Sequence, residues 1–169
     1  MTPKPMTYIE TYKHGLLYES YYISHLSPCT HVLKEVIKDT HFPNRMQIFA
    51  AFGRFTARLH EQGMLHADYS MGNILFEPTK QGAEFQLVDL NRMRFGQRIN
   101  CRRGCRNFER IDTDHEALST IAQAYAQARG YNVEECVRLV LKMRWRKHKN
   151  RNRRNLSNNR NSKKCNNIY

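Results

Sequence analysis

Three polar side chains in the middle of the sequence could together act on a phosphate group. Asp68 and Asn73 lie in the run His66-Ala-Asp-Tyr-Ser-Met-Gly-Asn73-Ile-Leu, and Asp89 follows sixteen residues after Asn73. A carboxylate such as that of Asp68 can accept a hydrogen bond from an attacking hydroxyl and take its proton late in a reaction. The Asn73 amide oxygen and the Asp89 carboxylate suit Mg²⁺, which prefers one or two carboxylates together with phosphate oxygens and water.

The neighbouring sequence predicts elements that would bring these groups together. An amphipathic helix ends just before His66, and an apolar strand, residues 85–88, leads into Asp89. This order and spacing is typical of kinase-like phosphotransferases and favours phosphoryl transfer from ATP with Mg²⁺. Asp68 is the predicted catalytic base, and Asn73 and Asp89 are the predicted metal ligands. We expect the His66 ring to bond backbone near Asp89 and to hold the two loops.

The alternative for this motif is structural: Asp68 and Asn73 would be turn residues, and Asp89 would end a strand.

The first half of the chain predicts two hairpins separated by helices. Residues 8–12 and 16–24 favour strands around a Lys-His-Gly turn, and residues 73–77 and 85–88 favour a second hairpin. Between them we expect a short helix over residues 31–38 and a longer one that starts with Pro43 in its first turn and stops at Gly63. The longer helix carries a predicted core stripe of Ile48, Phe49, Phe52, Phe55 and Leu59.

The second half predicts helices after an irregular basic stretch. Residues 90–110 are rich in arginine and are expected to be irregular. A capping box from Thr113 to Glu116 then opens a helix that ends at Gly130. A last helix begins at Asn132, and the predicted buried residues of the two helices are Leu118, Ile121, Ala122, Tyr125, Val133, Cys136, Val137, Val140 and Leu141. This order predicts an α+β fold rather than repeated βαβ units.

The charge of the chain is concentrated at its C-terminal end. The net charge is +13, and the last 32 residues hold twelve basic residues and no acidic ones. The rest of the chain is therefore almost neutral, which disfavours a nucleic-acid-binding domain. Residues 147–169 are expected to be a disordered basic tail. Residues 144–164 could contact an anionic membrane surface or bind RNA non-specifically, although the lack of interleaved aromatic side chains gives no stacking platform.

The cysteines and the chain start indicate the compartment. The five cysteines are odd in number and widely spaced, and no signal peptide or apolar span is evident, so we expect reduced thiols and a cytoplasmic protein, with peripheral contact to the inner face of the membrane. Cys101 and Cys105 have the spacing of half a zinc site, but no second ligand pair stands nearby, and zinc is not favoured.

The motif residues resemble those of the lipopolysaccharide kinase family, the Kdo and heptose kinases. The similarity rests on the run from His66 to Leu75, on Leu87-Val-Asp-Leu-Asn-Arg92, and on Asn107-Phe-Glu-Arg110. It implies a protein-kinase-like fold, ATP and Mg²⁺ as cofactors, and phosphorylation of a sugar hydroxyl on a lipid-linked saccharide or another anionic sugar acceptor. The resemblance also implies a hinge over residues 22–27 that holds adenine, with Tyr22 and Ser24 as cofactor-binding residues. The arginines of residues 90–110 could then line the acceptor site.

The sequence departs from that family before the motif. No Gly-x-Gly run precedes Asp68, and Lys4 and Lys13 are the only lysines ahead of the expected hinge. We therefore expect residues 1–26 to be the end of an N-lobe, with its hairpin and hinge, and residues 27–146 to be a reduced, mostly helical C-lobe. The alternatives are a catalytically inactive kinase-like binding module and, from another class, a basic nucleic-acid-binding protein. The sequence does not fix the oligomeric state.

Overall fold

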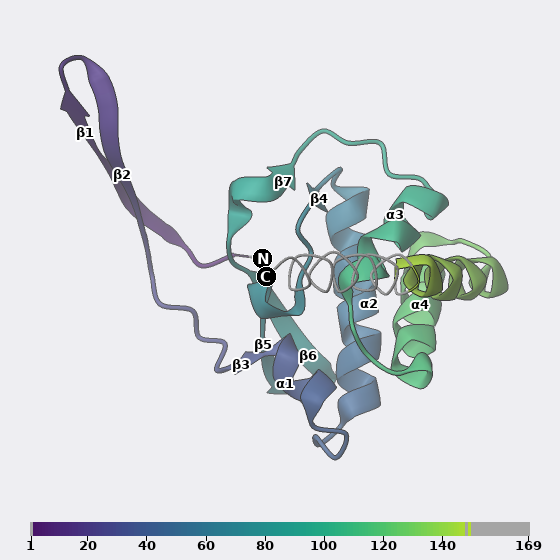
Figure 1. Cartoon of the computed structure of the whole chain (residues 1–169). Coiled ribbons are helices and arrows are strands. Elements are labelled where there is room, and N and C mark those ends of the chain that lie inside the picture. Colours follow the sequence, from purple (N-terminus) through teal and green to yellow (C-terminus); the bar gives the residue numbers. More distant parts are fainter. Residues whose placement is uncertain (1, 148, 150–169) are drawn as a thin grey trace, which may run out of the picture.

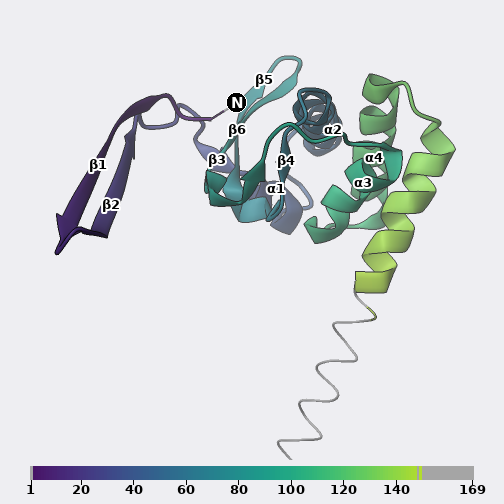
Figure 2. The same cartoon turned by 90° about the horizontal axis from the view of Figure 1, so that it is seen from above.

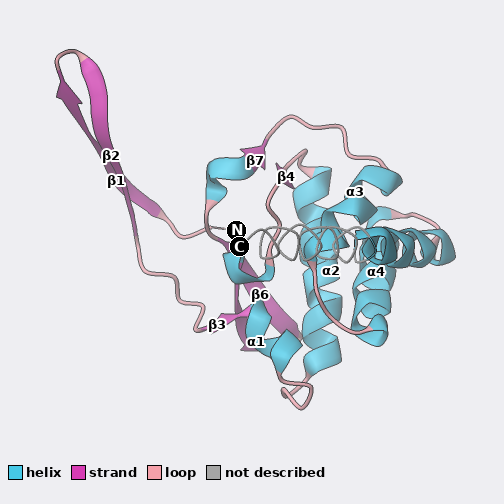
Figure 3. Ribbon diagram, viewed as in Figure 1, coloured by secondary structure: helices cyan, strands magenta, loops and turns pink. Residues whose placement is uncertain are grey.

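The computed structural model describes residues 2–147 and 149. A long hairpin extends from a body in which a small antiparallel sheet lies on one side and helices lie on the other (Figure 1). The strands and helices occupy separate regions and do not alternate along one sheet (Figure 3), as the predicted α+β class requires. None of the helices in the described part combines the length and the apolar character that crossing a membrane would need.

The projecting hairpin pairs β1 (Pro5–Lys13) with β2 (Leu16–Ser24) in antiparallel register. Its turn is His14-Gly15, where both residues have positive φ, 52° and 78°. Two such residues match the right-handed twist of the strands, which explains why this short turn closes the hairpin. The hairpin predicted from the sequence is thus confirmed. Every residue of β1 is exposed, and the hairpin stands clear of the body in a second view as well (Figure 2).

The core forms where α2 (Arg45–Glu61) packs against α4 (His115–Arg129) and against a three-stranded sheet. That sheet has the order β3 (His31–Val32), β5 (Ile74–Thr79), β6 (Gly82–Leu87), all antiparallel. The predicted stripe of α2 is buried throughout and confirms the 3.6-residue period. A short helix, α1 (Leu33–Lys38), follows β3 as expected.

Two helix starts differ from the sequence prediction. The long helix α2 begins at Arg45 with Asn44 as its N-cap, so Pro43 lies before the helix and not in its first turn. The start of α4 is capped by Asp114, whose carboxylate accepts a hydrogen bond from the Ala117 amide, and not by Thr113. The Asp114 carboxylate also accepts a 2.5 Å hydrogen bond from the buried Arg45 guanidinium, an interaction between distant segments that local sequence does not reveal.

The expectation of an irregular stretch over residues 90–110 is wrong. A 3₁₀ turn, η2 (Leu90–Arg92), and β7 (Met93–Arg94) lead to helix α3 (Cys101–Asn107) and to a second turn, η3 (Phe108–Arg110). Strand β7 pairs with β4 (Leu65–His66). Helix α3 is only seven residues long and mostly arginine and cysteine, so it shows no helical period. The buried side chains of Cys105 and Phe108 hold it in place instead.

The last helix occupies residues 133–147 and also includes residue 149. Asn132 caps it, since its side chain accepts a hydrogen bond from the Glu135 amide at 2.8 Å. Cys136 and Val140 are buried, and Val133, Val137 and Leu141 pack against the core, as predicted. Apart from Lys147 and Lys149, which are helical, the expected disordered tail over residues 147–169 lies outside the described residues.

Gly53 sets how closely α2 and α4 can approach. A Cβ atom at this position would meet the Ile121 carbonyl oxygen and would lie 3.1 Å from both Ala124 Cβ and the Tyr125 amide nitrogen. Two of these three atoms belong to the α4 backbone and cannot move without shifting the helix. We predict that Gly53→Ala lowers the free energy of unfolding by about 1–3 kcal/mol, the usual cost of overpacking a close-packed interior. Urea denaturation would measure the change.

Gly72→Ala is the matched control, because nothing lies within 4 Å of a Cβ at that position. If the two variants lost the same amount of stability, close packing at Gly53 would not be the cause.

A buried histidine gives the fold a predictable response to acid. His60 Nδ1 lies 2.9 Å from the Tyr125 hydroxyl and Nε2 lies 3.3 Å from the Asn107 side-chain nitrogen. Since the Asn107 amide group donates, Nε2 accepts and the proton of the neutral ring sits on Nδ1. Burial, with smaller contributions from Arg129 and Arg103, lowers the pKa of His60 from 6.5 to about 3.

Between those two pH values the unfolded chain binds a proton at His60 that the folded chain does not. The free energy of unfolding should therefore fall as the pH drops from about 6.5 towards 3, by up to about 1.4 kcal/mol per pH unit from this group. In His60→Gln the side chain does not titrate, so its stability deficit against the wild type should shrink as the solution is acidified. Urea denaturation at pH 7, 6 and 5 tests this. The control is His25→Gln, at an exposed site, whose difference in stability from the wild type should be the same at the three pH values. A pH-independent stability deficit in His60→Gln would contradict the lowered pKa of His60.

Candidate active site

One buried imidazole connects the two loops that carry the predicted site residues. His66, at the end of β4, is 1 % exposed. Its Nε2 lies 3.0 Å from the Asp89 carbonyl oxygen, and its Nδ1 accepts a 3.1 Å hydrogen bond from the Asp68 amide. Because a carbonyl only accepts, Nε2 carries the proton and the ring is neutral. This is the bond to the Asp89 backbone that the sequence predicted.

Asp89 lies directly after β6 in a backbone conformation that few residues adopt. Its φ and ψ are 56° and 61°, which is the left-handed region. Aspartate adopts this region more readily than most residues do. A non-glycine residue in this region is still uncommon, and it often marks a functional position. The side chain is exposed, so its carboxylate is accessible to a cation from solvent.

The register of the second hairpin, β5–β6, places the Asn73 backbone next to the segment that leads into Asp89. Ile74 pairs with Leu87 across β5 and β6, and the Val88 amide donates to the Asn73 carbonyl at 3.0 Å. The Asn73 side-chain nitrogen lies 3.4 Å from the Asp68 carbonyl oxygen, a long hydrogen bond that closes the motif loop. The structure therefore brings the backbones of Asp68, Asn73 and Asp89 together through directly bonded neighbours.

Two arginines contact the Asp68 carboxylate. Arg92 Nη1 lies 3.5 Å from Oδ2, and Arg110 Nη1 is paired with Oδ1. The Asp68 side chain is 23 % exposed, whereas those of Arg92 and Arg110 are 63 % and 42 % exposed. We call Arg92 and Arg110 the arginine pair. Both side chains are exposed enough to change conformation, so an anionic group that enters the site could form ion pairs with them in place of Asp68.

A cleft of about 590 Å³ lies beside Asp89. It is lined by Thr2, Pro3, Tyr22, Ser24, Leu87, Val88, Asp89, Leu90 and Asn91. Tyr22 and Ser24, the residues expected to hold adenine, therefore face the same cleft as the predicted metal ligand Asp89. The volume suits a nucleotide, and the apolar and aromatic lining near Ser24 suits a base.

The donors offered by Asn73 and Asp89 fit Mg²⁺. Asn73 offers a neutral oxygen and Asp89 a carboxylate, and both are hard ligands that leave room for phosphate oxygens and water. Neither position offers a histidine or cysteine side chain, the ligand types that would favour a softer metal over Mg²⁺.

Tyr69 is a further site residue, and the sequence analysis missed its role. Its hydroxyl lies 2.8 Å from the Thr56 hydroxyl, which itself donates to the Phe52 carbonyl of α2. The Tyr69 ring is 1 % exposed and stacks on Phe52 at 5.5 Å between ring centroids. Burial raises the pKa of Tyr69 far above its usual value, so the hydroxyl stays protonated and donates. The tyrosine fixes the motif loop to the core helix one residue after Asp68.

The model of the Lipopolysaccharide kinase (Kdo/WaaP) family matches residues 3–131 of the sequence. The chain belongs to this family. The match covers more than half of the chain and includes the projecting hairpin, the motif loop and α4. The kinase-like fold implied by this membership agrees with the α+β arrangement described above. No curated protein matches the sequence at a significant level.

The arginine pair comes from two of the segments that resemble the Kdo/WaaP family. Arg92 ends the run Asp89-Leu-Asn-Arg92, and Arg110 ends Asn107-Phe-Glu-Arg110. Both segments deliver their arginine to the Asp68 carboxylate, although Arg110 lies 42 residues further along the chain. Neither arginine is assigned to Asp68 by the sequence alone. The only available signal was that each motif ends in an arginine.

We predict that His66→Phe separates the two motif loops. The substitution keeps a ring of similar size but leaves the Asp68 amide and the Asp89 carbonyl without their partner, at a cost of about 1–3 kcal/mol in the free energy of unfolding. The loss should be accompanied by faster hydrogen exchange of the Asp68 amide, measured by NMR. The control His25→Phe changes an exposed ring and should alter neither quantity. An Asp68 amide that exchanges as slowly in His66→Phe as in the wild type would contradict the bridging role.

Proposed function

We propose that this protein is a kinase that transfers the γ-phosphoryl group of ATP to a sugar hydroxyl of a lipopolysaccharide core, with Kdo or heptose as the acceptor sugar. The observation that carries this proposal is the connection through His66 of the Asp68 loop to the Asp89 loop. This connection, with the hydrogen bonds of Asn73, holds the loops of a base, an amide and a second carboxylate together, and Asp89 borders a nucleotide-sized cleft. Membership in the Kdo/WaaP family supports the choice of reaction and of acceptor class.

In the proposed reaction the acceptor hydroxyl donates a hydrogen bond to the Asp68 carboxylate. The hydroxyl oxygen forms a bond to the γ-phosphorus as the bond from that phosphorus to the leaving oxygen of ADP breaks, and the hydroxyl proton passes to Asp68. Asn73 and Asp89 would hold Mg²⁺, which supplies charge neutralisation on the phosphates when it is bound. Tyr22 and Ser24 would border the adenine.

The arginine pair has two roles in this proposal. In the free protein Arg92 and Arg110 balance the charge of Asp68, Arg92 through an ion pair and Arg110 through a charge-assisted hydrogen bond that orients the carboxylate. When substrates bind, the same guanidinium groups can contact the transferring phosphoryl group or an acidic acceptor. A Kdo unit carries a carboxylate, which matches the bidentate geometry of arginine. Further exposed arginines from the same stretch are available to an anionic acceptor: Arg94, Arg98, Arg102 and Arg106.

We also propose a cytoplasmic location, with residues 144–164 in contact with an anionic membrane surface. Arg144 is excluded from that contact surface, because its side chain is 12 % exposed and is paired with Asp112. Arg146 is exposed and free to face a membrane. The remaining basic residues of this segment, apart from Lys147 and Lys149, lie outside the described part of the chain.

A kinase-like binding module without turnover is the second candidate. Within residues 2–147 and 149, the lining of the nucleotide-sized cleft includes no lysine or arginine. A phosphate group in the cleft would thus depend on the metal for its positive charge. Such a module would bind nucleotide without transferring phosphate.

We predict that the full chain binds Mg·ATP and that Asp89→Asn weakens binding at least about tenfold. The substitution leaves a neutral amide oxygen but removes the negative charge of the metal ligand, and we expect a cost within the 10–100-fold known for residues that support such ligands. Asparagine is the chosen replacement because it tolerates the left-handed backbone at this position while it removes the charge. Isothermal titration calorimetry, with and without Mg²⁺, measures the effect, and Glu134→Gln, an exposed site on the last helix, is the control.

Turnover separates the two candidates. With lipid A carrying Kdo as the acceptor, Asp68→Asn should reduce the rate of ADP formation by about 10²–10⁴-fold while leaving Mg·ATP binding in place. Binding without any turnover in the wild type would favour the binding module. Equal affinity of the wild type and Asp89→Asn for Mg·ATP would contradict the assignment of the metal site.

A further inference from the structure

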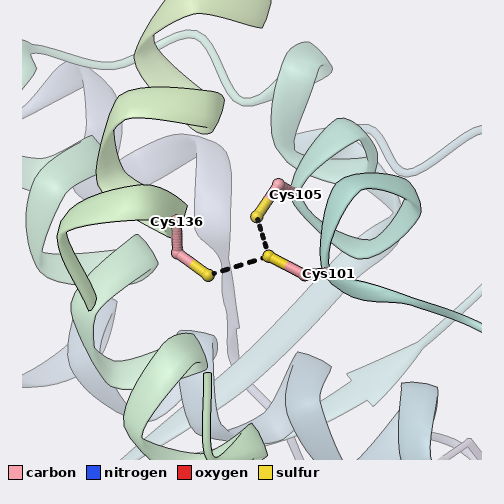
Figure 4. A group of neighbouring side chains, drawn as sticks. All are labelled: Cys101, Cys105 and Cys136. Carbon is pink, nitrogen blue, oxygen red and sulfur yellow. Dashed lines mark hydrogen bonds between the residues drawn. The ribbon is translucent and has the colours of Figure 1, made fainter. Parts of the chain in front are cut away.

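Three cysteines from two helices meet away from the candidate active site. Cys101 and Cys105 lie one turn apart on α3, and Cys136 comes from the helix of residues 133–147 (Figure 4). The Cys101 sulfur lies 3.3 Å from that of Cys136 and 4.0 Å from that of Cys105, and all three sulfurs fall within 4.8 Å of one another. Cys105 and Cys136 are fully buried, whereas Cys101 is partly exposed.

We propose that Cys101, Cys105 and Cys136 bind one zinc ion. Ligands at about 2.3 Å from zinc in a tetrahedron are about 3.8 Å apart, and the sulfur–sulfur separations of 3.3 and 4.0 Å lie on either side of that value. The three cysteine sulfurs would occupy three of the four coordination positions of the zinc ion. The partial exposure of Cys101 leaves the fourth position to water or to a small ligand from solvent.

Charges of both signs flank such a site: Arg102, Arg103 and Arg106 share α3 with two of the cysteines, and Glu135 precedes Cys136. Three thiolates and Zn²⁺ carry a net charge of −1. The Arg129 guanidinium donates to the carbonyl of Ile99, two residues before Cys101, at 3.0 Å, and its other terminal nitrogen, Nη1, is buried without a hydrogen-bond partner among the described residues.

Packing of three neutral thiols is the simpler explanation for the cluster, because free cysteine is often buried as a small apolar residue. Burial raises the pKa of the Cys105 and Cys136 thiols, so without metal they are neutral. Simple packing, however, does not require three sulfurs to converge from two helices. A zinc ion accounts for this convergence, and it displaces the thiol protons on binding.

The site would fix α3 to the last helix. Local sequence stabilises α3 poorly, since the helix has only seven residues, and five of them are arginine or cysteine without a helical period. Arg110, which contacts Asp68, follows Cys105 by five residues. The metal therefore stabilises the segment that delivers one member of the arginine pair, although metal binding itself does not depend on the proposed kinase activity.

The full chain, reduced with a non-thiol reductant and freed of metal by a chelator, would be titrated with Co²⁺ and then with Zn²⁺. We expect one Co²⁺ per chain, with the visible bands of tetrahedral cobalt and a thiolate-to-cobalt charge-transfer band, both removed by Zn²⁺. Cys101→Ser should bind at least 10–100-fold more weakly, and the control Cys29→Ser should bind as the wild type does. No charge-transfer band, or the same affinity in Cys101→Ser as in the wild type, would overturn the proposal.

A second measurement on the unaltered chain covers the case in which Cys101→Ser fails to fold. Zinc should protect Cys101, Cys105 and Cys136 from alkylation by iodoacetamide and should leave Cys29 reactive, as read by mass spectrometry of peptides. Zinc should also raise the melting temperature of the wild type, because it binds the folded state. Equal labelling of Cys101 with and without zinc would overturn the site.

Discussion

The candidate active site depends on the pair of hydrogen bonds made by the buried ring of His66. One ring nitrogen accepts from the Asp68 amide and the other donates to the Asp89 carbonyl, so a single side chain fixes the relative position of two loops more than twenty residues apart. A buried imidazole must satisfy both nitrogens, and any displacement of either loop would leave a polar group unpaired. The left-handed backbone at Asp89 can persist because this bond and the β5–β6 pairing over-determine it.

The core holds the motif loop from the other side. Tyr69 bonds Thr56 of α2 and stacks on Phe52, so the loop is bonded to the sheet through Asn73 and to the helix through Tyr69. Helix α2 is itself held against α4 by the close approach at Gly53. The position of the Asp68 carboxylate thus follows from helix packing as well as from the motif. Preorganisation of this kind is what phosphoryl transfer asks of a protein, because the chemistry needs orientation and charge more than it needs covalent steps.

Helix α3 links the arginine pair to the cysteine cluster. Its C-terminal end leads into η3 and Arg110, while Cys101 and Cys105 face Cys136 on the last helix. The projecting hairpin β1–β2 contrasts with this well-packed region. Its exposed side chains include Tyr8, Tyr12, Leu16, Tyr18 and Tyr21, and it contributes to the site only through Tyr22 and Ser24 at its base. The helical part of the chain therefore supplies most of the rigidity of the site.

Local patterns in the sequence determined both hairpins, the apolar faces of α2 and α4, and the identity of Asp68, Asn73 and Asp89 as one group. These features depend on periodicity, turn residues and short spacing, which are properties of neighbouring residues. The tertiary structure alone decided the cap at Asp114, the existence of α3, the arginine pair and the convergence of Cys136 on Cys101 and Cys105. Each of these features joins residues more than twenty positions apart or depends on burial against such residues. Such contacts are selected by the packing of the whole chain, so no local pattern encodes them.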